Sequence, residues 1–292
     1  MSNLRVPSMF VADMHHIYGR FLKLAEEFGH TEAYARELTK LLPLPVSSAP
    51  AFLDRVTEVW RYDYGLPFDF PNDWAIGTDQ WPEVGILYRV IDAANRNLDP
   101  QLLLGWLKRL SNESKHMDVM TEMRPILDLK DEKLIFEVSG RGIGDTTIDW
   151  LIEPPGKRPI LLEVKNRVVS FIQRLETRLP SKKTKNDYRK NKTPNPANLF
   201  KSSIKKFAPS KRSEILQGVW IHTGIKEDIK KLADFFSSLD DKRIHFAVLA
   251  GWMKDATILS RSKEDSDYLI SIFGIEASGR FISENYDNST RV

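Results

Sequence analysis

Two acidic residues and a lysine interrupt two neighbouring apolar segments of the sequence. Asp149 lies within the segment 146–152, and Glu163 and Lys165 lie at the end of the next apolar segment, which begins at Pro159. Residues i and i+2 of a strand point to the same face, so Glu163 and Lys165 are expected to project together. A tight hairpin between the two segments would bring Asp149 alongside them. The spacing therefore predicts two carboxylates and one ammonium at one end of a sheet.

These side chains together suit the hydrolysis of a phosphodiester bond. Carboxylates supply the hard oxygen ligands that Mg²⁺ prefers, and the ion keeps positions for water and a substrate phosphate. A bound metal ion polarises the phosphodiester and lowers the pKa of its water, while a lysine can orient that water or stabilise charge on the phosphate. The sequence predicts Mg²⁺, with Mn²⁺ as a substitute, held by Asp149 and Glu163 beside Lys165.

A lysine two residues after an acid is a weak signal on its own, because the chain contains six such pairs. Two of the six lie in helical patterns, where residues i and i+2 do not share a face, and three lie in loops. Only Glu163 ends an apolar strand that follows another strand with its own acid. The competing interpretation is a salt bridge where a buried strand emerges into solvent.

The positive charge of the chain is concentrated directly after these residues. The whole sequence has a net charge of +3, but residues 165–212 contain 15 lysines and arginines against two acids, which gives +13 there and −10 elsewhere. Such a basic cluster is the usual footprint of phosphate binding, although a solvated insertion has the same composition. The basic residues expected to bind nucleic acid are Arg167, Lys182, Lys183, Lys185, Arg189, Lys190, Lys192, Lys205 and Lys206.

The hydrophobic pattern predicts an α/β protein with a helical N-terminal region. Helical spacing of apolar residues dominates residues 8–42, and another helix is expected from about 99 to 117. Residues 1–95 are assigned to a separate helical region, for which target recognition or partner binding is the hypothesis.

Strand patterns begin after residue 131. Short connections that contain glycine or proline join the first three strands, which predicts antiparallel hairpins. Residues 96–292 are assigned to this second domain, with a basic insertion at about 166–212, and its last 40 or so residues give no clear pattern. The predicted elements are strands at 134–138, 146–152 and 159–164, helices at 168–179 and 196–208, a strand at 218–222, a helix at 226–236 and a strand at 245–250.

At Asp149, Glu163 and Lys165 the sequence resembles the PD-(D/E)xK nuclease superfamily. The matching features are Asp149, a gap of 13 residues and the Glu-Val-Lys sequence that ends at Lys165, in an order of helix, three strands, helix and strand similar to the core of that family. Ile148 stands where the family often has proline, which is a common variation. The resemblance covers roughly residues 97–250 and implies a restriction-endonuclease-like mixed sheet flanked by helices. It also implies that Asp149 and Glu163 bind Mg²⁺ and that Lys165 assists the nucleophile.

Many members of this family add a glutamate from the helix before the sheet, and three residues compete for that role. Glu113 fits by position and lies on or beside the apolar stripe of the predicted helix, where a carboxylate needs a partner because burying it bare is costly. Glu122 and Glu137 are the alternatives, Glu137 because it lies in the first predicted strand. Gln173, on the helix after the motif, matches a polar position that some members use.

Composition excludes several other classes of protein. The absence of cysteine excludes disulfides, thiolate metal sites and a cysteine nucleophile. No apolar run approaches the ~20 residues of a membrane-spanning helix. The first residues lack the charged head and apolar stretch of a signal peptide, so a cytoplasmic protein is expected.

These observations predict a Mg²⁺-dependent endonuclease that cuts DNA, with a homodimer or a protein partner as its assembly. A non-catalytic nucleic-acid-binding or scaffold protein with the same fold is an alternative, and an RNA-processing nuclease is another. The presence of Asp149, Glu163 and Lys165 together favours the enzyme, because a decayed site usually loses one of them. Phosphate contacts carry no sequence information, so the target is not predicted.

Overall fold

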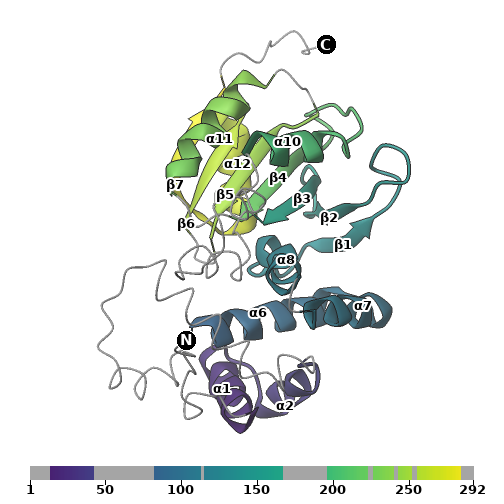
Figure 1. The fold of residues 1–292 in the computed structure, drawn as a ribbon, viewed down its shortest axis with the longest axis vertical. Helices are drawn as coiled ribbons and strands as arrows, with labels where there is room; N and C mark the ends of the chain where they lie inside the picture. Colours follow the sequence, from purple (N-terminus) through teal and green to yellow (C-terminus); the bar gives the residue numbers. More distant parts are fainter. Residues whose placement is uncertain are drawn as a thin grey trace, which may run out of the picture. The chain divides into compact units, whose positions relative to one another are not determined.

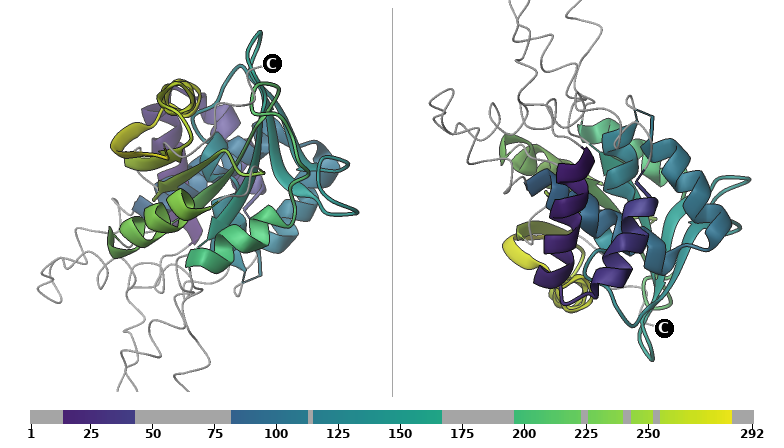
Figure 2. Two further views of the ribbon diagram at one scale, coloured as in Figure 1. Left: turned by 90° about the horizontal axis from the view of Figure 1, so that it is seen from above. Right: turned by 90° about the horizontal axis from the view of Figure 1, so that it is seen from below.

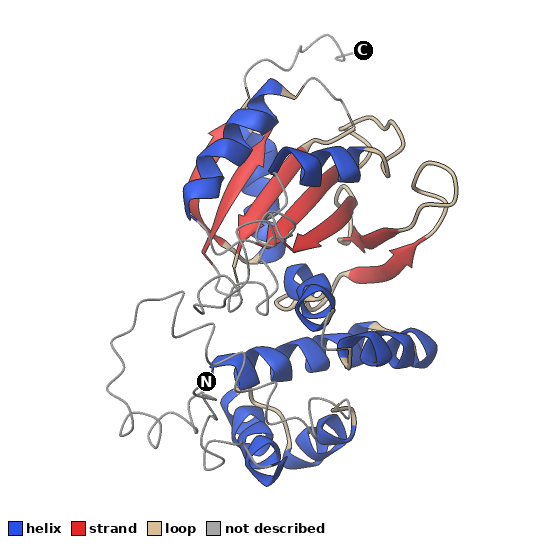
Figure 3. Ribbon diagram, in the orientation of Figure 1, coloured by secondary structure: helices blue, strands red, loops and turns tan. Residues whose placement is uncertain are grey.

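The computed structural model describes residues 14–42, 82–112, 115–166, 196–222, 226–239, 243–251 and 255–283. The chain forms two compact units, one ending at Met120 and the other beginning at Thr121. The first unit is helical, and the second contains a seven-stranded sheet with helices (Figure 1, Figure 3). The protein is therefore α/β with a helical N-terminal region, as predicted.

Amphipathic helices build the first unit. Helices α1, α2 and α6 pack together, with the ring of Phe21 edge-on to Tyr88 and His30 Nδ1 2.8 Å from the Tyr88 hydroxyl. The helices predicted in 8–42 are confirmed where the structure describes that range, whereas α6 was not predicted. The described bounds are α1 (Met14–Glu27), α2 (Glu32–Lys40), α6 (Pro82–Asn97) and α7 (Pro100–Leu110), followed by α8 (His116–Glu122), which reaches into the second unit.

Helix α7 is shorter than predicted. Asp99 caps its start, because the carboxylate accepts hydrogen bonds from two N–H groups of the first turn at 2.9 and 3.0 Å. The helix ends at Leu110, after which the Ser111 hydroxyl donates to the carbonyl of Lys108 at 2.8 Å. A side chain that binds its own backbone competes with continuation of the helix. The single helix expected over 99–117 is therefore wrong beyond Leu110, and α8 begins separately.

The sheet of the second unit has its strands in sequence order from β1 to β7. Strands β1, β2 and β3 are antiparallel, β3, β4 and β5 are parallel, β6 is antiparallel to β5, and β7 is parallel to β6. The predicted hairpins and five predicted strands are confirmed, while β6, α12 and β7 were not predicted. The strands are β1 (Lys133–Val138), β2 (Ile148–Glu153), β3 (Ile160–Asn166), β4 (Leu216–His222), β5 (Phe246–Ala250), β6 (Asp255–Ser260) and β7 (Glu276–Ile282).

Helices cover both faces of this sheet. Helices α10 (Pro196–Ile204) and α11 (Lys226–Ser238) lie on one face and α12 (Lys263–Phe273) lies on the other (Figure 2). Leu161 and Val219 belong to the core under α10 and α11, whereas Trp220 packs edge-on against Phe273 of α12. Because side chains alternate along a strand, Glu163 shares the α10 and α11 face with Leu161.

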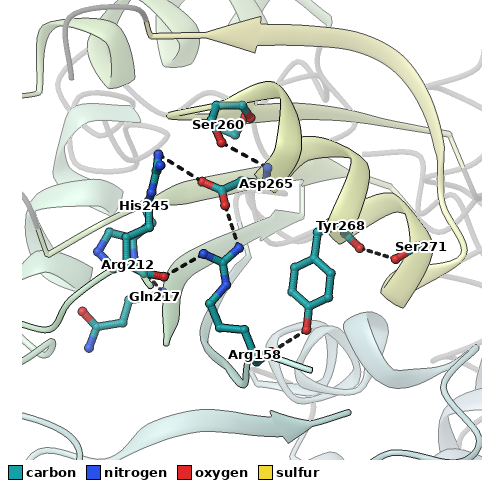
Figure 4. A network of polar contacts seen from close by, with 9 residues as sticks. Arg158, Arg212, Gln217, His245, Ser260, Asp265, Tyr268 and Ser271 are labelled. Atoms are coloured by element: carbon teal, nitrogen blue, oxygen red, sulfur yellow. Dashed lines mark hydrogen bonds and ion pairs between the residues drawn. The ribbon is translucent and has the colours of Figure 1, made fainter. Parts of the chain in front are cut away.

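A buried carboxylate ties together the starts of β3 and β4 and the first turn of α12. Asp265 Oδ1 binds Arg158 Nη2 at 2.7 Å, and Asp265 Oδ2 lies 3.4 Å from Arg212 Nη1 (Figure 4). Arg158 also donates to the carbonyl of Arg212 at 2.7 Å, and the Tyr268 hydroxyl donates to the carbonyl of Arg158. Part of the positive charge of 165–212 is therefore engaged in holding the fold.

Replacement of Asp265 by alanine should lower the free energy of unfolding by about 3 kcal/mol, because it leaves two partly buried guanidinium groups without their carboxylate. Urea-induced unfolding measures this loss. Asp267→Ala is the matched control, since Asp267 lies on the same helix in an exposed pair with Arg280 and should change stability by no more than about 0.5 kcal/mol. Equal losses in the two variants would contradict the assigned role of Asp265.

Candidate functional site

Asp149 and Glu163 meet where the pairing of β2 with β3 ends. The last paired residues are Trp150 and Leu162, so Asp149 and Glu163 are the next residues in this register. Asp149 Oδ2 accepts a hydrogen bond from the Val164 N–H at 2.6 Å, which satisfies a main-chain donor at the point where the ladder stops. The hairpin thus brings the two predicted acids together through the main chain.

Glu163 is the centre of the cluster. Its side chain is 1% exposed, and its Oε1 lies 2.5 Å from both Lys165 Nζ and Lys206 Nζ. Glu163 Oε2 is also buried, and among the described residues it has no hydrogen-bond partner. A buried carboxylate oxygen without a donor is costly, so Oε2 is the atom of this cluster that most needs a ligand.

The electrostatics of the cluster make Asp149 hard to ionise. The pKa of Asp149 is raised from its ordinary value of 3.8 to about 6, chiefly by burial and next by the negative charge of Glu163. The Val164 N–H, Lys206 and Lys165 act in the opposite direction. Two carboxylates forced close together in a poorly hydrated place are typical of sites that bind a cation or transfer a proton.

The donor set fits a hard divalent cation. Mg²⁺ is commonly bound through one or two carboxylates, with waters and substrate phosphate in the remaining positions. Asp149 and the free Oε2 of Glu163 would supply two such oxygens. Within the described part of the chain no group of three or more histidine, aspartate or glutamate side chains gathers, so a third protein ligand is not seen there.

The structure brings together Asp149, Glu163 and Lys165 from the predicted site and adds Lys206 to them. Lys206 was expected only among the residues that hold nucleic acid at large. Its neighbour Lys205 is exposed on the surface. The other predicted residues lie outside the described ranges: Glu113, Gln173, Arg167, Lys182, Lys183, Lys185, Arg189, Lys190 and Lys192.

Two of the three candidates for the upstream acid can be placed. The main-chain carbonyl of Glu122 accepts the indole N–H of Trp150 at 2.7 Å. Glu137 lies between the two β1 residues that pair with Trp150 and Ile148, so it stands across the ladder from Asp149. It is exposed and has a φ of 52°, which is rare for a residue with a side chain. Unusual backbone of this kind is concentrated at functional sites, and this is what Glu137 offers for the role, whereas Glu122 offers a buried side-chain oxygen.

The chain matches no protein-family model, no curated protein and no solved structure. None of its described helices is both long enough and apolar enough to cross a membrane.

Proposed function

We propose that this protein is a Mg²⁺-dependent endonuclease that hydrolyses phosphodiester bonds of DNA. The observation that carries this proposal is the pairing of Lys165 and Lys206 with buried Glu163, next to Asp149, which accepts the Val164 N–H. Its support is chemical: paired carboxylates, one of them with an open buried oxygen, stand beside ammonium groups that can face a phosphate.

The topology around the cluster agrees with the resemblance to the PD-(D/E)xK superfamily. That resemblance implies three strands, a helix and a further strand, and the second unit has antiparallel β1 to β3, then α10, then β4 parallel to β3. Glu163 and Lys165 lie near the end of β3, as the motif requires. The restriction-endonuclease-like fold is therefore part of the proposal.

Each side chain of the cluster has a separate role in the proposed reaction. Asp149 and Glu163 would hold Mg²⁺, which when bound supplies Lewis-acid polarisation of the phosphodiester and a water of lowered pKa. Lys165 pairs with Glu163 Oε1 and leaves Oε2 open for a ligand. The Lys165 side chain is 22% exposed, so a water or a phosphate group that enters from solvent can contact its ammonium.

Cleavage of supercoiled plasmid tests this function. Wild-type protein should cut in the presence of Mg²⁺ and not in EDTA, and Lys165→Ala should lower the rate by about 10²-fold or more while DNA binding persists in the same samples. Binding should weaken steeply with salt because the contacts are to phosphates. Lys231→Ala, an exposed lysine on α11, is the matched control and should cut at the wild-type rate.

Each result separates the candidate functions. Firm DNA binding without cleavage would favour the non-catalytic nucleic-acid-binding protein, and cleavage of RNA in place of DNA would favour the processing nuclease. Cleavage that survives Lys165→Ala would show that the reaction takes place elsewhere on the chain. Deletion of the helical N-terminal region would test its hypothetical role in recognition, since an unchanged choice of cleavage sites would count against that role.

A further inference from the structure

The main chain of Lys206 is held by the loop between β1 and β2. Its carbonyl accepts hydrogen bonds from the Ile143 N–H at 2.8 Å and from the Thr146 hydroxyl at 3.4 Å. The next residue, Phe207, forms an antiparallel bridge with Gly142 and is fully buried. Because the Lys206 ammonium lies 2.5 Å from Glu163 Oε1, this lysine is fixed at both ends.

Gly142 allows the loop to approach Lys206 this closely. A Cβ at position 142 would lie 2.4 Å from Thr146 Oγ1, 2.6 Å from the Thr146 carbonyl oxygen and 3.0 Å from the Lys206 carbonyl oxygen. Two of these three atoms belong to the main chain, so a larger residue would force the loop and the Lys206 segment apart. The strand that carries Asp149 begins directly after this loop, at Ile148, so one hairpin positions both groups.

Lys165 and Lys206 place two ammonium groups at one oxygen of Glu163. Lys165 already supplies one ammonium to Oε1, and Lys206 brings a second to the same atom, where the two cations repel each other. The Lys206 side chain is 31% exposed, so its ammonium is reached from solvent. An ammonium that is held in place, shared with another cation and open to solvent is suited to bind an incoming anion.

We propose that Lys206 is a second lysine of the catalytic site and binds the phosphate group at the reacting bond, and that the loop 139–147 holds it there through Gly142. This inference rests on the proposed nuclease function. Lys206 differs in this from its neighbour Lys205, which is exposed. Gly142 is a positioning residue, because it acts only through Lys206.

The test compares Lys206→Met, Lys206→Arg, Gly142→Ala and the double variant Gly142→Ala/Lys206→Met, with Lys231→Met as the control. Single-turnover cleavage at saturating DNA measures the reaction, and fluorescence anisotropy of a labelled duplex in EDTA measures binding without metal. Lys206→Met should lower the cleavage rate by about 10²-fold, and Lys206→Arg should recover part of it because the positive charge is kept. Gly142→Ala should lower the rate by about 10-fold in the wild-type background.

The double variant distinguishes positioning from general damage. If Gly142 acts through Lys206, Gly142→Ala should change the rate by no more than about 2-fold once Lys206 is methionine. A loss of similar size in both backgrounds would overturn the positioning role. Thr146→Val, which removes only the hydroxyl bonds, replaces Gly142→Ala in the same cycle if the alanine variant does not fold.

Different results would contradict the role of Lys206 and the nuclease function. Cleavage by wild type with an unchanged rate in Lys206→Met would overturn the role of Lys206 and leave the nuclease intact. Absence of cleavage by wild type would overturn the nuclease function, and the phosphate contact would then be judged by binding in EDTA. In that case weaker binding by Lys206→Met than by Lys231→Met would support the contact, and equal binding would overturn it.

Discussion

Replacement of Glu163 by glutamine should abolish Mg²⁺-dependent DNA cleavage, with a fall in single-turnover rate of about 10³-fold or more. The wild-type carboxylate contacts both lysines through Oε1 and has a second, buried oxygen that is open to a ligand. The amide is neutral and therefore loses both features. Calorimetric titration with Mn²⁺ should show a parallel loss of metal binding, because an amide oxygen is a weaker ligand than a carboxylate for a hard cation. Cleavage and metal binding should therefore be lost together.

The control for this variant lies on the same sheet. Glu153→Gln breaks a cross-strand ion pair with Lys133, whose atoms are 2.8 Å apart and whose side chains are exposed. It should leave cleavage and metal binding unchanged and alter stability by less than about 1 kcal/mol. Retention of full cleavage in Glu163→Gln would mean that the ion pairs at Glu163 serve only the fold.

Glu163→Gln should also reduce stability, although less than it reduces activity. The two ammonium groups at Oε1 would face a neutral oxygen, and their mutual repulsion would no longer be offset. Both lysines are partly exposed and can move toward water, which limits the loss to about 2 kcal/mol. Circular dichroism should therefore show a folded protein at 25 °C.

The sheet could be predicted because its buried strands are nearly continuous in apolar residues. Strands β2 to β5 are almost entirely buried, so Asp149 and Glu163 stand out against an apolar background. Strand β7 lacks that signal, because it lies at the edge of the sheet and is largely exposed, with Glu276, Gly279 and Arg280 in its sequence. Burial alone does not decide the outcome, because β1 lies at the other edge and was predicted, whereas β6 is buried between β5 and β7 and was missed.

The role of Lys206 could not be predicted from its position in the chain. Lys205 and Lys206 are identical neighbours within one basic segment, and nothing local distinguishes them. The difference arises from the loop 139–147, some 60 residues earlier, which binds the Lys206 carbonyl and fixes the direction of the side chain. A contact between residues so distant in sequence leaves no trace in the local pattern around Lys206.

Replacement of Asp149 by asparagine should stabilise the protein above pH 6 while abolishing cleavage. The folded protein holds the Asp149 proton more tightly than the unfolded chain, because the pKa is about 6 when folded and 3.8 ordinarily. The stability that this protonation contributes is present below about pH 4 and is lost as the pH rises to about 6. Asparagine never ionises, so the variant should exceed wild type by about 2 kcal/mol at pH 8 and by less at pH 5.

Urea-induced unfolding without divalent cations at pH 5, 6 and 8 checks this difference. Asp234→Asn, an exposed aspartate on α11, is the control and should stay within about 0.5 kcal/mol of wild type at every pH. If Asp149→Asn were less stable than wild type at pH 8, the ionised carboxylate would be part of a stabilising ion pair, and a structural role would follow. If Asp149→Asn is the more stable protein at pH 8, the wild-type carboxylate costs the fold stability, which favours a role in binding or catalysis over a structural one.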